Sequence, residues 1–143
     1  MLEKDGEMQK LNLIIFIQIL FGLSLPLTQV FANSMDEVIC SAMKGMVEQE
    51  LKKIPFKAGD YSVVALSVDC KKKILKTEKK HINLKKTDFK ANFQEISQKI
   101  WEKANCSNMI FNTETGWSNV QLVKGKEGVL VSTVRADFRQ CSK

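Results

Sequence analysis

Four cysteines, all on the C-terminal side of an apolar segment near the N-terminus, limit how this chain can fold more than any other feature. They are Cys40, Cys70, Cys106 and Cys141. An even number of cysteines behind an export signal is typical of a disulfide framework, and four cysteines allow three pairings. The spacing favours Cys40–Cys70 and Cys106–Cys141, since each pair closes a loop of about 30 to 36 residues and would stabilise the fold by roughly 3 to 4 kcal/mol.

The disulfide prediction depends on the N-terminal segment, residues 1–32. Lys10 precedes an apolar run from Leu11 to Leu25, and Pro26 follows the run. Val30-Phe31-Ala32 resembles the Ala-x-Ala type of cleavage site. This order is that of a cleavable signal peptide. A membrane-spanning anchor is the alternative, but it requires roughly 20 apolar residues, and the run here is shorter and contains polar residues. We therefore predict cleavage after Ala32.

Cleavage would leave residues 33–143 as a single exported domain, periplasmic or secreted, with no transmembrane span in its mature form. Met8 is a plausible true start, because Met8-Gln9-Lys10 gives a short basic region whereas three acidic residues crowd the segment before it. A chain of this size can bury a modest core in one domain.

The first half of this domain predicts a helix followed by two strands. The helix begins at Ser34, with a capping box to Glu37, and ends at Pro55. The range Tyr61–Asp69 is rich in β-branched residues and reads as a strand. A second, lysine-rich strand follows and carries Ile74, Leu75, Ile82 and Leu84.

The sequence of the second half also predicts a helix followed by strands. A helix from Asp88 to Cys106 has an apolar face formed by Phe89, Phe93, Ile96, Ile100 and Ala104. Short strands are predicted at Met109–Asn112 and Val120–Val123, and a long strand at Val129–Phe138. That last strand would place Leu130, Ser132, Val134, Ala136 and Phe138 on a core face, with Thr133, Arg135 and their neighbours on a mixed face that ends in charged residues.

The helix, hairpin, helix, hairpin order predicts an α+β fold. We expect both helices to pack on one face of an antiparallel sheet, with one disulfide in each half.

The net charge is +6, and lysine provides most of it. Between residues 71 and 86 eight lysines and His81 face only one glutamate. Such a cluster can attract a polyanion or an anionic membrane surface, or it can be a solubility feature that prevents edge-to-edge strand pairing. Arginine, which phosphate recognition prefers, is scarce, so sequence-specific nucleic-acid binding is not expected. The candidate partner contacts in this cluster are Lys71, Lys72, Lys73, Lys79 and Lys80.

Trp117 and His81 are two further ring-bearing side chains to be placed. Trp117 follows a polar, turn-rich loop, where a large aromatic residue either folds back on the sheet or contacts a partner. Both alternatives stay open, so Trp117 joins the candidate partner contacts. His81, within the lysine cluster, is expected to be a surface residue.

Catalytic and metal sites are difficult to assemble from this sequence. The chain has one histidine and no Cys-x-x-Cys or His-x-x-x-His spacing. We therefore expect no metal, no cofactor and no catalytic residue. A small hydrolase acting on envelope or host polymers is the alternative, and it would need two carboxylates facing across a cleft. Its candidates are Asp60, Asp69, Asp88, Glu114 and Asp137.

The sequence therefore predicts a small exported protein, stabilised by disulfides, that binds another macromolecule without catalysing a reaction. The expected partner is a protein or an envelope polymer. The alternatives are the hydrolase and a basic protein that binds a polyanion or a membrane surface.

Overall fold

The computed structural model describes residues 35–143. The predicted signal segment, residues 1–32, lies outside the described residues. The first half contains helix α2 (Met35–Leu51) and strands β1 (Phe56–Ala58), β2 (Tyr61–Asp69) and β3 (Ile74–His81).

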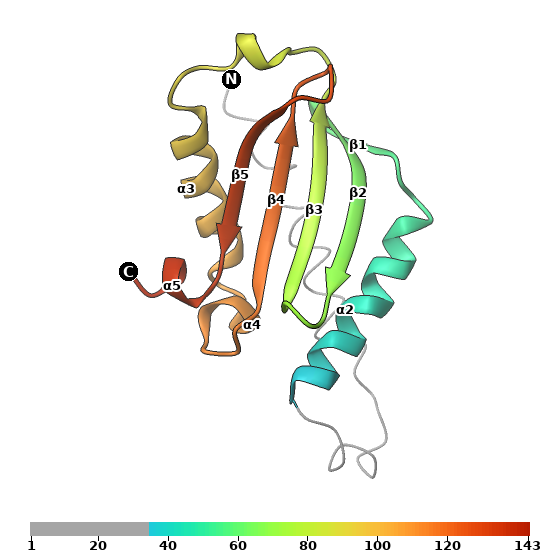
Figure 1. The fold of residues 1–143 in the computed structure, drawn as a ribbon, viewed down its shortest axis with the longest axis vertical. Coiled ribbons are helices and arrows are strands. Elements are labelled where there is room, and N and C mark those ends of the chain that lie inside the picture. The colour runs from blue at the N-terminus through green and yellow to red at the C-terminus, as the bar shows by residue number, and fades with distance from the viewer. Residues whose placement is uncertain (1–34) are drawn as a thin grey trace.

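The second half begins with the 3-10 turn η1 (Lys86–Asp88) and helix α3 (Phe93–Asn105). The short helix α4 (Met109–Asn112) and strands β4 (Ser118–Lys124) and β5 (Leu130–Ala136) follow, and α5 (Phe138–Cys141) ends the fold (Figure 1). The α+β class and the helix, hairpin, helix, hairpin order are those expected from the sequence.

The five strands form one sheet in the order β1-β2-β3-β4-β5. The prediction of an antiparallel sheet is wrong at its centre, where β3 and β4 are parallel. The reason is the connection between them: α3 carries the chain back along the sheet, so β4 starts at the same end as β3. The sheet is therefore mixed, and the parallel pair joins the two halves.

Three local predictions are also corrected. The segment Met109–Asn112 is helical rather than extended, because the Asn108 side chain accepts a hydrogen bond from the Ile110 N–H and starts a helical turn. The short edge strand β1 was not predicted. Leu130 is exposed rather than in the core, because a register shift at Val123/Lys124 moves its side chain to the other face of β5.

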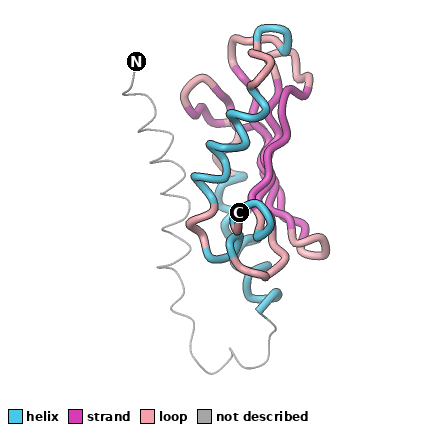
Figure 2. The backbone as a smooth tube through the Cα atoms, turned by 90° about the vertical axis from the view of Figure 1, so that its left-hand side faces the viewer, coloured by secondary structure: helices cyan, strands magenta, loops and turns pink. Residues whose placement is uncertain are grey.

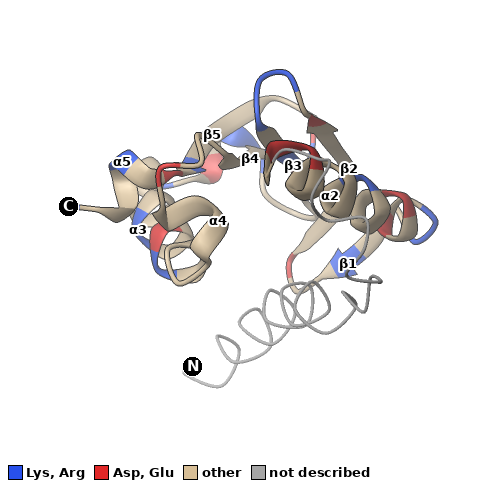
Figure 3. Cartoon of the chain, turned by 90° about the horizontal axis from the view of Figure 1, so that it is seen from below, with Lys and Arg blue, Asp and Glu red and all other residues tan. Residues whose placement is uncertain are grey.

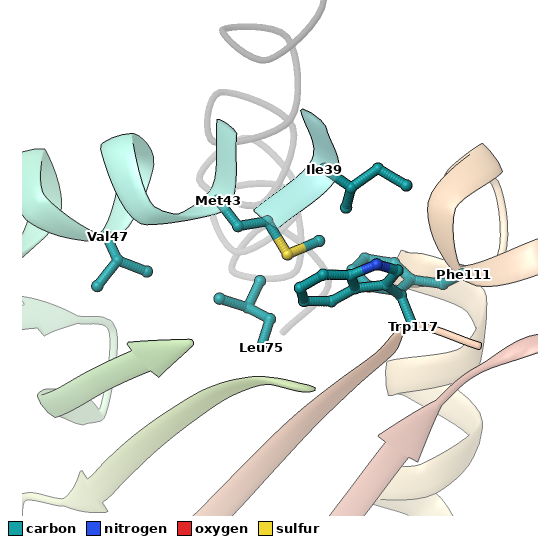
Figure 4. Close-up of a cluster of buried hydrophobic side chains, with 6 residues drawn as sticks. All are labelled: Ile39, Met43, Val47, Leu75, Phe111 and Trp117. Carbon is teal, nitrogen blue, oxygen red and sulfur yellow. The ribbon is translucent and has the colours of Figure 1, made fainter. Parts of the chain in front are cut away.

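Helix α2 packs on the sheet through Ile39, Met43 and Val47, which recur every four residues and are all buried. Together with Leu75, Phe111 and Trp117 they form the larger hydrophobic cluster (Figure 4). The Trp117 side chain is 1% exposed and lies within this cluster. Its role as a partner contact is therefore wrong, because the polar loop before it turns the indole inward.

Helix α3 meets the sheet through a face that its apolar pattern did not indicate. Ile96 and Ile100, predicted as core residues, are exposed by 44% and 52%. The side chains that reach the sheet are instead Gln94, Gln98 and Trp101. The apolar pattern does not indicate this face because it takes no account of glutamine side chains that hydrogen-bond the backbone of β5.

The two glutamines close the outer edge of β5. Gln94 donates to the Thr133 carbonyl at 2.7 Å and accepts from the Thr133 N–H at 3.1 Å. Gln98 makes the same pair of bonds with Arg135, at 2.6 and 3.0 Å. Each side-chain amide thus replaces a residue of a neighbouring strand, and backbone groups that would otherwise invite strand pairing are occupied.

Both disulfides have the pairing expected from the spacing. Cys40 of α2 joins Cys70, which follows β2, with 5.6 Å between their Cα atoms. Cys106, at the end of α3, joins Cys141 of α5, with 5.2 Å between Cα atoms. The first bridge therefore ties α2 to the β2–β3 turn, and the second ties the end of α3 to α5, so each lies within one half of the domain.

Replacing both glutamines, Gln94→Leu/Gln98→Leu, should lower the free energy of unfolding by about 1–2 kcal/mol, because the backbone groups of Thr133 and Arg135 lose their partners. Urea unfolding measures the loss. A substitution on the exposed side of the same helix, Lys103→Gln, should change stability by less than about 0.5 kcal/mol. Equal stability of the two variants would contradict this role of the glutamines.

Candidate interaction surface

The structure separates the lysines that the sequence grouped together. Lys71, Lys72 and Lys73 lie in the turn between β2 and β3, at one end of the sheet (Figure 3). Lys79 and Lys80 lie near the other end of β3, about 20 Å away for a strand of this length. As neighbours on one strand they point to opposite faces of the sheet. The single five-lysine contact surface predicted from the sequence is therefore wrong.

Lys73 has a structural role in the turn. Its backbone has a φ of 54°, and its Nζ lies 2.7 Å from Asp36 of α2 and donates to the Thr115 carbonyl at 3.0 Å. Lys73 therefore links the β2–β3 turn to both halves of the domain. Lys71 and Lys72 are exposed in the same turn.

Lys79 lies on the helix-covered face, against aromatic rings. Its Nζ is 4.3 Å from the centre of the Tyr61 ring, an arrangement that favours a cation–π contact. Burial lowers the pKa of the Lys79 ammonium to about 8. This lysine is therefore poorly placed to bind a partner.

His81 is 7% exposed, so its prediction as a surface residue is also wrong. Its ring packs edge-on against Tyr61 and Phe89. Its Nδ1 accepts hydrogen bonds from the backbone N–H groups of Asn83 and Leu84, at 3.1 and 3.0 Å. The histidine thus shapes the loop after β3 instead of serving as a surface group.

The strand register defines a second face of the sheet, away from the long helices. Residues buried against α2 and α3, including Leu75, Val134 and Ala136, share one face. Figure 2 shows the sheet edge-on, with a long helix on one side of it. We call the other side the open face. It carries Lys57, Ser62, Ala65, Ser67, Asp69, Ile74, Lys76, Glu78, Lys80, Ser118, Val120, Leu122, Lys124, Leu130, Thr133 and Arg135.

An ion network occupies the middle of the open face. Glu78 lies 2.9 Å from the Nζ of Lys76 and 2.6 Å from the Nζ of Lys124. The hydrogen bond from Lys124, followed by that from Lys76, lowers the pKa of the Glu78 carboxyl. One carboxylate is thus shared by two lysines, and the network keeps an excess positive charge.

A second ion pair stands at the β5 side of the open face. Arg135 Nε lies 2.7 Å from Asp137, and its guanidinium also donates to the Ser118 hydroxyl at 3.0 Å. These contacts fix the guanidinium close to the sheet.

Two other carboxyl groups have a lowered pKa. A hydrogen bond from Lys99 lowers the pKa of Glu95, and the backbone N–H of Lys86 lowers that of Glu127. Within residues 35–143 no group of three or more histidine, cysteine, aspartate or glutamate side chains is placed to hold a metal ion.

Four residues of the open face were missed as candidate contacts: Lys57, Lys76, Lys124 and Arg135. The alternation along β3 already puts Lys76 and Lys80 on one face, so that pair could have been found. Lys57 required β1, and Lys124 required the parallel pairing of β3 with β4. No helix among residues 35–143 is long and apolar enough to cross a membrane.

No family model matches the chain, and no curated protein matches it at a significant level. Among solved structures, a crystal structure described as that of a "putative secreted protein" from Pseudomonas aeruginosa has the same fold, with a TM-score of 0.57. The match covers 77% of this chain and 99% of that chain, at 14% identity. At this identity the likeness shows the fold and nothing more.

The low pKa of Lys79 predicts a rise in stability at alkaline pH. Below pH 8 the folded protein bears the full cost of a buried ammonium. Between pH 8 and the ordinary value near 10.5 the folded state releases this proton before the unfolded chain does, so the cost disappears. This gain is on the order of 3 kcal/mol in total, of which about 2 kcal/mol is reached by pH 9.5, and Lys79→Met should lose it.

Urea unfolding of wild type and variant between pH 7 and 9.5 measures this difference. Lys80→Met, on the open face, is the control and should differ from wild type by the same amount at every pH. A difference for Lys79→Met that does not change with pH would rule out burial as the cause.

Proposed function

We propose that this chain is an exported, disulfide-stabilised and non-catalytic protein whose open face binds another macromolecule. The observation that carries the proposal is the asymmetry of the sheet. One face is covered by α2 and α3, whereas the other presents long polar side chains with no helix over them in residues 35–143. A sheet face of this breadth fits a macromolecule better than a small substrate, which is usually bound in a concave pocket.

The edges of the sheet give further support. The Gln94 and Gln98 amides occupy the edge of β5, and β1 pairs with the first part of β2. A partner strand is therefore hindered from pairing with the edge of β5. The open face is more accessible to a partner than this edge.

The export part of the proposal rests on the N-terminal segment and on the two disulfides, which persist in oxidising compartments. Mass spectrometry of the exported protein should give Asn33 as its first residue, because Val30-Phe31-Ala32 provides the cleavage site. An exported product that still begins at Met8 would contradict the cleavable signal.

Site-specific cross-linking tests the open face directly. A photoreactive residue at position 133, where the Thr133 side chain points from the open face, should form adducts with the partner in cells that export the protein. The same residue at position 103, on the exposed side of α3, serves as the control and should form few. Adducts at position 103 alone, or at neither position, would contradict a binding role for the open face.

A further inference from the structure

We propose that the partner of the open face is an acidic glycan, a sugar polymer that bears repeated carboxylate, sulfate or phosphate groups. This inference rests on the proposed function, because it requires the open face to be the binding surface. Its evidence is separate, and comes from how the strand register arranges charges across the sheet.

Positive side chains form two rows that cross the strands. In the first row Lys57 of β1, Lys80 of β3 and Lys124 of β4 are aligned, with Ser62 of β2 between the first two. Neighbouring strands lie about 4.8 Å apart, so the Cα atoms of Lys57 and Lys80 are about 10 Å apart and those of Lys80 and Lys124 about 5 Å. These ammonium groups could contact successive anionic groups of an extended chain.

The second row lies nearer the other end of the strands. It aligns Ser67 of β2, Lys76 of β3, Val120 of β4 and Arg135 of β5. Lys76 and Lys80 are four residues apart on β3, so the rows are separated by about 13 Å. Glu78 stands between them and is bonded to one lysine of each row, Lys76 and Lys124.

The charges on this face do not cancel. Its carboxylates each have a basic partner already: Glu78 has two lysines, Asp137 has Arg135, and Asp69, at the turn, has Lys72 at 3.9 Å. Lys57 and Lys80 have no ion-pair partner among residues 35–143. The charge that remains is therefore positive and lies mainly in the first row.

The other side chains of the face distinguish among polyanions. No residue assigned to the open face is aromatic, so the face lacks the rings on which nucleic-acid bases stack. Val120 and Leu122 are half-buried, and Leu130, which pairs with Lys124, is the one apolar residue assigned to this face that is exposed, by 45%. A membrane-binding surface inserts several such residues, so this face fits a bilayer less well. Hydroxyl groups lie among the cations instead: Ser62 stands between Lys57 and Lys80, Ser67 is next to Lys76, and Thr133 lies between the two rows. Hydroxyls can bond sugar oxygens directly.

The test measures binding of the exported protein to two acidic glycans over a range of salt concentrations. Heparin carries sulfates and carboxylates, and polygalacturonate carries carboxylates alone. The variant Lys57→Gln/Lys80→Gln removes the unpaired charges of the first row. The matched control, Lys44→Gln/Lys103→Gln, removes two exposed charges from α2 and α3 and changes the net charge equally.

We expect the open-face variant to bind at least about tenfold more weakly at 0.1 M salt and to show a smaller salt dependence, because fewer counterions are released. The control should change affinity by less than about twofold. Both variants should keep the wild-type unfolding midpoint, since none of the four lysines has an ion-pair partner in the described chain. Binding to heparin alone would assign sulfate groups, and binding to both glycans would include carboxylates.

Equal losses in the two variants, or no binding to either glycan, would overturn this inference. Tighter binding to phosphatidylglycerol vesicles than to either glycan would also overturn it, and would indicate that the partner is a membrane surface. The cross-linking experiment separates the two proposals. Adducts at position 133 together with unchanged glycan affinity of the Lys57→Gln/Lys80→Gln variant would reject the glycan while keeping the open face as the binding surface.

Discussion

The parallel pairing of β3 with β4 is the constraint on which the rest of this structure depends. Each half of the domain is a helix and a hairpin, and a two-stranded hairpin with one helix has little core of its own. The parallel pair joins the hairpins into one five-stranded sheet. It also brings Leu75 of the first half into the cluster that contains Phe111 and Trp117 of the second. The hydrophobic core is therefore shared between the halves.

The same pairing produces the two unlike faces. Because β3 and β4 are adjacent and in register, residues of one parity on both strands lie beneath the helices, and those of the other parity form the open face. The Glu78 carboxylate can reach Lys124, 46 residues away in sequence, only through this register. The ion network of Lys76, Glu78 and Lys124 thus depends on the pairing of β3 with β4. A search of the sequence for local motifs cannot find it for that reason.

Local pattern predicted the elements well where a periodic signal matched the final environment. Strand β2 has the bounds expected from its β-branched residues, and the helix expected from Ser34 onward is present as α2, which begins at Met35. The prediction failed at α3 because an apolar stripe was taken to mark the core, whereas Gln94 and Gln98 found backbone partners on the edge of β5. A glutamine that completes a strand edge has no signature in a hydrophobic pattern. The antiparallel sheet was predicted wrongly because pairing between the hairpins depends on the path of α3, which local sequence does not define.

The lysines of β3 show why composition could not identify the candidate site. Lys79 and Lys80 are the same residue type at adjacent positions, yet one ammonium lies over the Tyr61 ring with a lowered pKa and the other faces away from the helices without an ion-pair partner among residues 35–143. A count of lysines gives both the same weight. Their environments differ because side chains alternate between the two faces of the sheet, and helices cover only the face that carries Lys79. The charge available to a partner therefore follows from strand parity and cross-strand register, and it is concentrated where Lys57, Lys80 and Lys124 align rather than where lysines are most frequent in the sequence.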